Sequence, residues 1–62
     1  MFRIIVSLRN VGEVIVAPTY DKLTHCLEVI DIMCQHNGDS AVVINVDVMS
    51  IVKFTRVNGK LT

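Results

Sequence analysis

The sequence predicts a small α+β fold of order ββαββ, a four-stranded and mainly antiparallel sheet with one helix packed on one face. Two observations predict this fold. Apolar and polar residues alternate towards both ends of the chain, which is typical of strands. Between them, over 20–36, apolar residues recur at helical spacing. With 62 residues in all, we expect a single domain covering 1–62.

The first hairpin is predicted from residues 2–9 and 12–17. In FRIIVSLR every second residue from the phenylalanine on is apolar, as in a strand with one face on a core. Asn10 and Gly12 then supply turn residues that tolerate positive φ. The returning strand, GEVIVA, is expected to end at Pro18, which cannot donate a hydrogen bond to a ladder.

The middle of the chain predicts one helix from Tyr20 to His36. Thr19 stands before it as a candidate N-cap. Asn37-Gly38 follows it and favours the left-handed conformation that often ends a helix. The apolar stripe of this helix comprises Leu23, Cys26, Leu27, Ile30, Met33 and Cys34.

A second hairpin is predicted from residues 40–46 and 51–57, because both segments are rich in β-branched residues. Asp47 separates them, since aspartate favours turns over strands. Asn58-Gly59 is the strongest short hairpin signal in the chain. It indicates a stub of return strand after it, with a frayed end as the alternative.

The strands carry more apolar residues than one helix stripe can cover. The face expected under the helix comprises Phe2, Ile4, Val6, Leu8, Val14, Val16, Val42, Ile44, Val46, Val52 and Phe54. The reverse face then keeps Ile5, Ile15, Ala17, Val43, Ile51 and Val57. No further element remains to cover that face, and a contiguous apolar patch on a small protein usually marks an interface. The alternative is that these are scattered strand formers, shielded by the stems of Arg and Lys.

The two cysteines are expected to be reduced and buried. Cys26 and Cys34 are eight residues apart in the predicted helix, about 12 Å along its axis. A disulfide needs Cα atoms within about 7 Å, so the two cannot be bridged. Zinc ligands on one helix are spaced four residues apart, and the histidines and cysteines lack that spacing. We therefore expect no metal at His25, Cys26, Cys34 and His36.

Catalytic groups are sparse in this sequence. His25 and His36 are roughly 16 Å apart on the predicted helix, and neither stands next to a nucleophile. Asp21, Glu28 and Asp31 form an ordinary charged helix face. All three glycines are expected in turns, which leaves no glycine-rich phosphate loop. We expect no enzymatic activity, no cofactor and no small-molecule substrate.

A short segment resembles a known family. The run LRNVGEVIV, residues 8–16, is similar to the opening of the carbon storage regulator family, small dimeric RNA-binding β proteins. In that family further strands follow, and a basic segment near the chain end contacts RNA. Here a long helix is expected at once and that basic segment is missing, so the sequence assigns the chain to no family.

Composition narrows the class of partner. The chain is 52% hydrophobic, yet no apolar run exceeds four residues, far short of the roughly 18 of a membrane span. Six basic residues balance six acidic ones, which weighs against non-specific binding to nucleic acid and favours self-association. The start of the chain lacks the long apolar segment of a signal peptide, so we expect a soluble, cytoplasmic protein.

Two hypotheses for function follow. The first is a protein-binding module, a homodimer or an inhibitor or regulator of a larger protein, in the size class that phages and mobile elements often encode. Its interface candidates are Ile5, Ile15, Val43, Ile51, Val57 and Ile32. The second is a nucleic-acid-binding regulator, although few aromatic residues are present for base stacking. Its basic rim would comprise Arg3, Arg9, Lys53, Arg56 and Lys60.

Overall fold

The computed structural model describes residues 1–62, apart from the side chains of residues 17 and 18. The chain forms β1 (Phe2–Leu8), β2 (Gly12–Tyr20), α1 (Leu23–Met33), β3 (Ser40–Asn45), β4 (Ser50–Val57) and β5 (Lys60–Leu61). The α+β class is confirmed. The strand count is wrong by one, because the return strand after Asn58-Gly59 pairs with β4 as a fifth strand and the order becomes ββαβββ.

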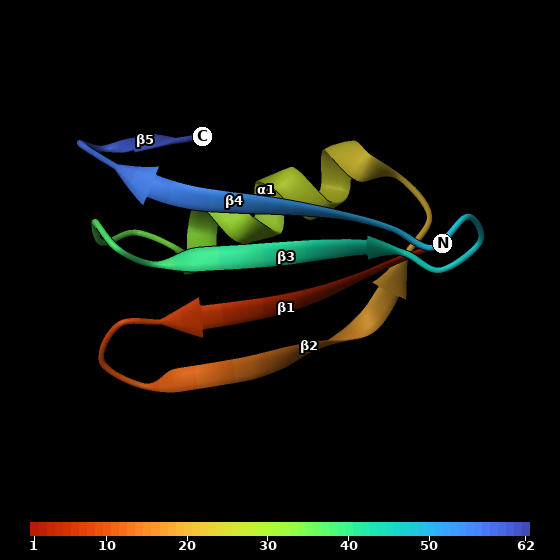
Figure 1. Ribbon diagram of the computed structural model, residues 1–62, viewed down its shortest axis with the longest axis horizontal. Coiled ribbons are helices and arrows are strands. Elements are labelled where there is room, and N and C mark those ends of the chain that lie inside the picture. The colour runs from red at the N-terminus through yellow and green to blue at the C-terminus, as the bar shows by residue number, and fades with distance from the viewer.

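The five strands form one sheet in the order β2-β1-β3-β4-β5, and each neighbouring pair is antiparallel. The two hairpins are joined by the pairing of β1 with β3, so these two strands are hydrogen-bonded on both sides. Figure 1 shows α1 lying behind β3 and β4, against one face of the sheet. In the part of the chain that the structure describes, no helix is long and apolar enough to cross a membrane.

The β2 strand is longer and α1 is shorter than the sequence predicts. β2 does not end at Pro18 but continues to Tyr20, which pairs with Phe2. It is an edge strand, where a proline is tolerated because only one side of the strand is hydrogen-bonded. The helix therefore begins at Leu23, with Lys22 in place of the predicted Thr19 as its N-cap.

The helix also ends earlier than expected. Its C-cap is Cys34, whose backbone N–H donates to the carbonyl of Ile30 at 2.7 Å. Gly38 does adopt a positive φ of 95°, but it does so in a separate turn between α1 and β3. There its N–H donates to the carbonyl of Arg56 at 2.9 Å, so this turn is hydrogen-bonded to β4.

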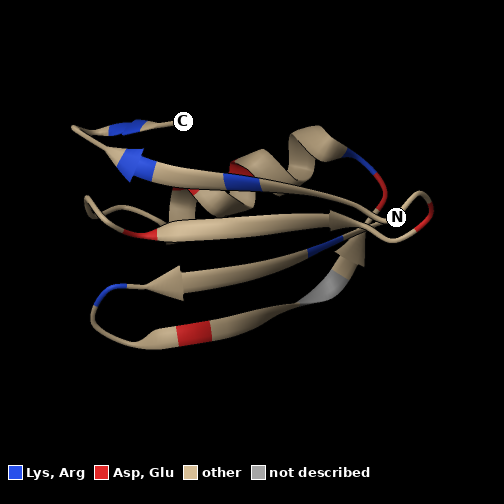
Figure 2. Ribbon diagram, viewed as in Figure 1, with Lys and Arg blue, Asp and Glu red and all other residues tan. Residues whose placement is uncertain are grey.

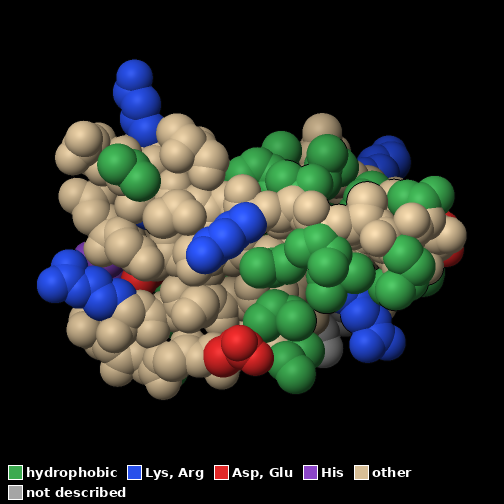
Figure 3. Space-filling model, viewed as in Figure 1, with side chains coloured by type: hydrophobic (Ala, Val, Ile, Leu, Met, Phe, Trp, Pro, Cys, Tyr) green, Lys and Arg blue, Asp and Glu red, His purple; other side chains and the backbone are tan. Residues whose placement is uncertain are grey.

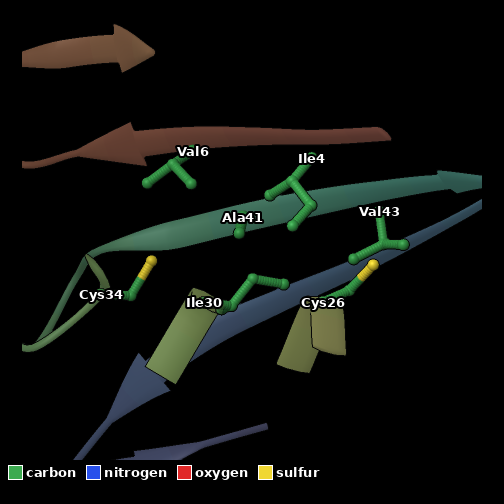
Figure 4. Close-up of a cluster of buried hydrophobic side chains, with 7 residues drawn as sticks. All are labelled: Ile4, Val6, Cys26, Ile30, Cys34, Ala41 and Val43. Carbon is green, nitrogen blue, oxygen red and sulfur yellow. The ribbon is translucent and has the colours of Figure 1, made fainter. Parts of the chain in front are cut away.

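The core lies between α1 and the two central strands. Figure 4 shows its side chains pointing toward one another from β1, β3 and the helix. The predicted helix stripe is confirmed in its centre, and both cysteines are free thiols that pack as small apolar groups. The buried apolar residues are Ile4, Val6, Cys26, Ile30, Cys34, Ala41 and Val43.

The face of β3 that meets the helix is the opposite of the predicted one. Ala41 and Val43 are buried opposite Val6 and Ile4, so Val42 points to the reverse face of the sheet. Ile44 and Val46 were also predicted to lie under the helix. Ile44 instead points to the reverse face, and Val46 lies exposed in the turn after β3. A one-residue step exchanges the two faces of a strand, and an apolar run such as AVVI contains no polar residue to mark which face is which.

Two glutamate substitutions test this assignment. Val43→Glu places an unpaired charge in the core, which costs several kcal/mol and should unfold so small a chain. Val42→Glu places the same charge on the open face, directly opposite Lys53, and should change stability by about 1 kcal/mol or less. Thermal unfolding followed by circular dichroism measures both. A stable Val43→Glu variant beside an unfolded Val42→Glu variant would contradict the assignment.

Candidate interaction surface

The sheet face turned away from α1 presents its side chains in three rows that cross the strands. The pairing of the strands defines each row, since paired residues point to the same side of a sheet. The first row is polar, the second is apolar except for a lysine, and the third is apolar except for an arginine. From β2 towards β4 the rows are Glu13, Ser7, Ser40 and Thr55; Ile15, Ile5, Val42 and Lys53; and Arg3, Ile44 and Ile51.

The aliphatic residues of the second and third rows adjoin one another across four strands. We call this set the apolar sheet face; it comprises Ile5, Ile15, Val42, Ile44 and Ile51. The outer two are 75% and 68% exposed, and the inner three are half-buried between their neighbours. Figure 3 shows apolar side chains gathered over the half of this face towards the β3–β4 turn. The helix packs on the opposite side, so it does not cover them.

The β3–β4 turn extends the apolar surface at one end of the sheet. Val48 and Met49 are 70% and 76% exposed there. The turn is held in place by its neighbours: the N–H of Val46 donates to the carbonyl of Met1 at 3.0 Å, and the N-terminal ammonium pairs with the carboxylate of Asp47. Asp47 in turn donates its N–H to the side-chain oxygen of Asn45 at 3.1 Å. These bonds keep the exposed turn next to the start of β1.

The predicted interface residues divide into three groups. Ile5, Ile15 and Ile51 lie on the apolar sheet face, as expected for their strands. Val43 is a core residue, and its place on the reverse face is taken by Val42 and Ile44, which the prediction put under the helix.

The other candidates lie apart from this face. Val57 is beyond the polar row, where β4 pairs with β5. Ile32 is 67% exposed on α1, in the other layer of the molecule. The side chain of Ala17, also expected on the reverse face, lies outside the described residues.

Arg56, a candidate for the basic rim, is a structural residue instead. Its guanidinium donates to the backbone carbonyls of Cys34 at 2.7 Å, of Asp31 at 3.2 Å and of Gly59 at 3.2 Å. It also pairs with the Asp31 carboxylate at 2.6 Å, and only 11% of the side chain is exposed. The planar fork of an arginine suits such a set of acceptors. Arg56 thus joins the end of α1 to the β4–β5 hairpin and is not available to a phosphate.

The other four basic candidates do not come together. Figure 2 shows basic residues at separate places in the fold: in the β1–β2 turn, near the start of β1, in the middle of β4 and in β5. Arg9 stands in that turn, and its guanidinium lies 3.5 Å from the carbonyl oxygen of Asn37. Arg3 and Lys53 are on the apolar sheet side, in different rows and on strands separated by β3.

Asp39 is a buried anchor that the sequence did not reveal. Its carboxylate accepts hydrogen bonds from the backbone N–H of Arg9 at 2.9 Å and of His36 at 3.1 Å, while its own carbonyl accepts the N–H of Arg56 at 2.9 Å. The bond from Arg9 is the main cause that lowers the pKa of Asp39; burial opposes it, and the His36 bond adds to it. One carboxylate therefore holds the β1–β2 turn, the loop after α1 and the start of β3 together.

Both thiols and the Asp39 carboxylate are buried. Burial raises the pKa of the Cys26 thiol, and burial together with the nearby Asp39 charge raises that of Cys34. Open hollows of about 400 Å³ and 390 Å³ flank α1, and the first is lined in part by Asp39, whose carboxylate already accepts two hydrogen bonds. Among the described residues, no three His, Cys, Asp or Glu side chains are grouped to hold a metal ion.

Comparisons of the chain with protein-family models, with curated proteins and with solved structures find no match. The geometry of the surface is therefore what bears on function.

The dependence of the melting temperature on acid pH tests whether the Asp39 carboxylate stabilises the fold. Its pKa is lower in the folded chain than in the unfolded chain, where aspartate titrates near pH 3.9. The carboxylate therefore stabilises the fold above that pH, and the stabilisation is lost as the pH falls through the folded pKa. Asp39→Asn should lower the melting temperature at neutral pH, with a difference from the parent that shrinks below about pH 4. A difference that stays constant down to about pH 2 would contradict the anchor.

Proposed function

We propose that this protein is a non-enzymatic protein-binding module that associates with its partner through its apolar sheet face. The proposal rests on one observation. Ile15, Ile5 and Val42 form a row that adjoins Ile44 and Ile51 in the next row, on a face that α1 leaves open. An exposed contiguous apolar patch on a small protein is typical of an interaction site.

The backbone under this surface supports a binding role. β1 and β3 are each paired on both sides, so the central part of the face is held by hydrogen bonds from two directions. All five side chains are β-branched and have few rotamers to lose. A surface of this kind loses little conformational entropy on association, which favours affinity.

The chemistry of the surface favours a protein over other partners. Small molecules bind in concave pockets, whereas these side chains stand on a sheet. Single-stranded nucleic acid needs aromatic platforms, and the three rows contain no aromatic side chain among the described residues. Aliphatic side chains on a sheet match another aliphatic protein surface.

The state of the thiols and of Asp39 supports binding rather than catalysis. A thiolate is the reactive form of cysteine, and burial raises the pKa of both thiols and so disfavours that form. The Asp39 carboxylate accepts hydrogen bonds from two backbone N–H groups, so its role is to stabilise the fold.

A matched pair of glutamate variants tests the proposal. Ile44→Glu changes the apolar sheet face, and Ile32→Glu adds the same charge to an exposed position on α1. We expect the parent and Ile32→Glu to bind the same protein, either a second copy or a protein from a lysate of the source cell, and Ile44→Glu to lose it. Light scattering of the pure protein and affinity capture followed by mass spectrometry measure the two cases.

Two results would contradict the proposal. One is a folded Ile44→Glu variant that binds whatever the parent binds, because binding would then not depend on the apolar sheet face. The other is co-elution of the parent with an oligonucleotide that weakens steeply with salt, which would favour nucleic-acid binding through backbone phosphates.

A further inference from the structure

We propose that the occupant of the apolar sheet face is a second copy of this chain, packed face to face about a twofold axis that runs parallel to the strands between β1 and β3. This inference rests on the proposed function and names its partner. The positions of the charged residues on the face, the fit of its rows and its area all favour this partner.

The charges on this face stand at complementary positions. Glu13 is on β2 and Lys53 is on β4, the two outer strands of the four that carry the rows, and the two residues are one row apart. A half-turn about the proposed axis exchanges β2 with β4 and keeps each row in place. Lys53 then lies over Ile15 of the second copy. Glu13 is two residues from Ile15 on the same side of β2, about 7 Å away, within reach of the lysine side chain.

Symmetry makes this contact twice. Each lysine stem covers an exposed isoleucine, and each ammonium meets a carboxylate, so both the apolar and the charged parts of Lys53 find a partner. Such pairs fix the orientation of an interface more than they strengthen it.

The remaining rows also fit under the same operation. Ile5 lies over Val42 of the second copy, and Val42 lies over Ile5 of the second copy. The two central strands of each copy are therefore in contact through aliphatic groups. Ile44 lies over the aliphatic stem of Arg3 of the second copy. In the polar row Ser7 faces Ser40. Two sheets packed in this way are about 10 Å apart with strands within about 30° of each other.

The obvious alternative twofold axis is disfavoured by charge. An axis that crosses the strands along the middle row would place Lys53 directly over Lys53 of the second copy. Like charges facing each other in an interface are costly. The axis parallel to the strands instead places each lysine beside a glutamate, and it is the arrangement that we propose.

The area of the face limits how much surface a dimer can bury. The molecule measures 31 × 20 × 17 Å, and the face seen in Figure 3 is the one bounded by the two longer dimensions, roughly 600 Å² in projection. The apolar sheet face occupies only part of this area, so two copies bury less than about 1,200 Å², at or below the lower end of the range for specific interfaces. We therefore expect a dimer that dissociates on dilution.

A charge exchange tests this arrangement. Sedimentation equilibrium over a range of concentrations gives the dissociation constant of the parent, of Lys53→Glu, of Glu13→Lys and of the double variant. We expect each single variant to weaken the dimer about tenfold or more, because two like-charge contacts replace two attractive ones. The double variant should return to within about threefold of the parent. Lys22→Glu, exposed next to α1, is the matched control and should leave the constant unchanged.

The outcomes separate this inference from the proposed function. A parent dimer whose double variant is no tighter than the singles overturns the twofold arrangement. A parent that stays monomeric at millimolar concentration overturns the second copy as the occupant. In both cases the capture experiment with Ile44→Glu still decides whether the face binds protein. Recovery in the double variant, with circular dichroism showing all four proteins folded, supports the arrangement.

Discussion

The fold depends on one constraint: a single helix covers only one face of the sheet. α1 has 11 residues and places Cys26 and Ile30 against β1 and β3. The two central strands, however, are apolar on both faces, with Ile4 and Ile5 as neighbours in β1 and Val42 and Val43 as neighbours in β3. Strands of that composition are usual where both faces of a sheet are covered. One face of this architecture is therefore left uncovered, and we propose that a partner covers it.

Two polar side chains determine which face is left open. Asp39, Ala41 and Val43 follow one another at alternate positions and are all buried. With the Asp39 carboxylate bonded to the backbone of Arg9 and of His36, the chain enters β3 with that set turned towards the helix. Arg56 closes the same end of the molecule by joining α1 to the β4–β5 hairpin. Polar contacts near the ends of the elements thus set the orientation of the apolar residues between them.

The sequence predicts those features of the fold that have a clear period. The helix stripe, the two hairpins and the faces of β1, β2 and β4 follow from alternation or from helical spacing, and this is why Ile5, Ile15 and Ile51 are found on the open face. The orientation of β3 could not be predicted in this way, because residues 41–44 are all apolar. The roles of Asp39 and Arg56 were also hidden, since their acceptors and donors are mostly backbone atoms distant in sequence, such as the N–H of Arg9 thirty positions away.

Thiol labelling at two adjacent positions tests the central claim, that the face of β3 bearing Val42 is open and is covered by association. Val42→Cys and Val43→Cys differ only in the side of the sheet to which the thiol points. Mass spectrometry of peptides separates their labelling from that of the buried Cys26 and Cys34. We expect fast labelling of Val42→Cys in dilute solution, slower labelling as the protein concentration rises, and slow labelling of Val43→Cys throughout. Faster labelling at Val43→Cys, or a rate at Val42→Cys that does not change with concentration, would contradict it.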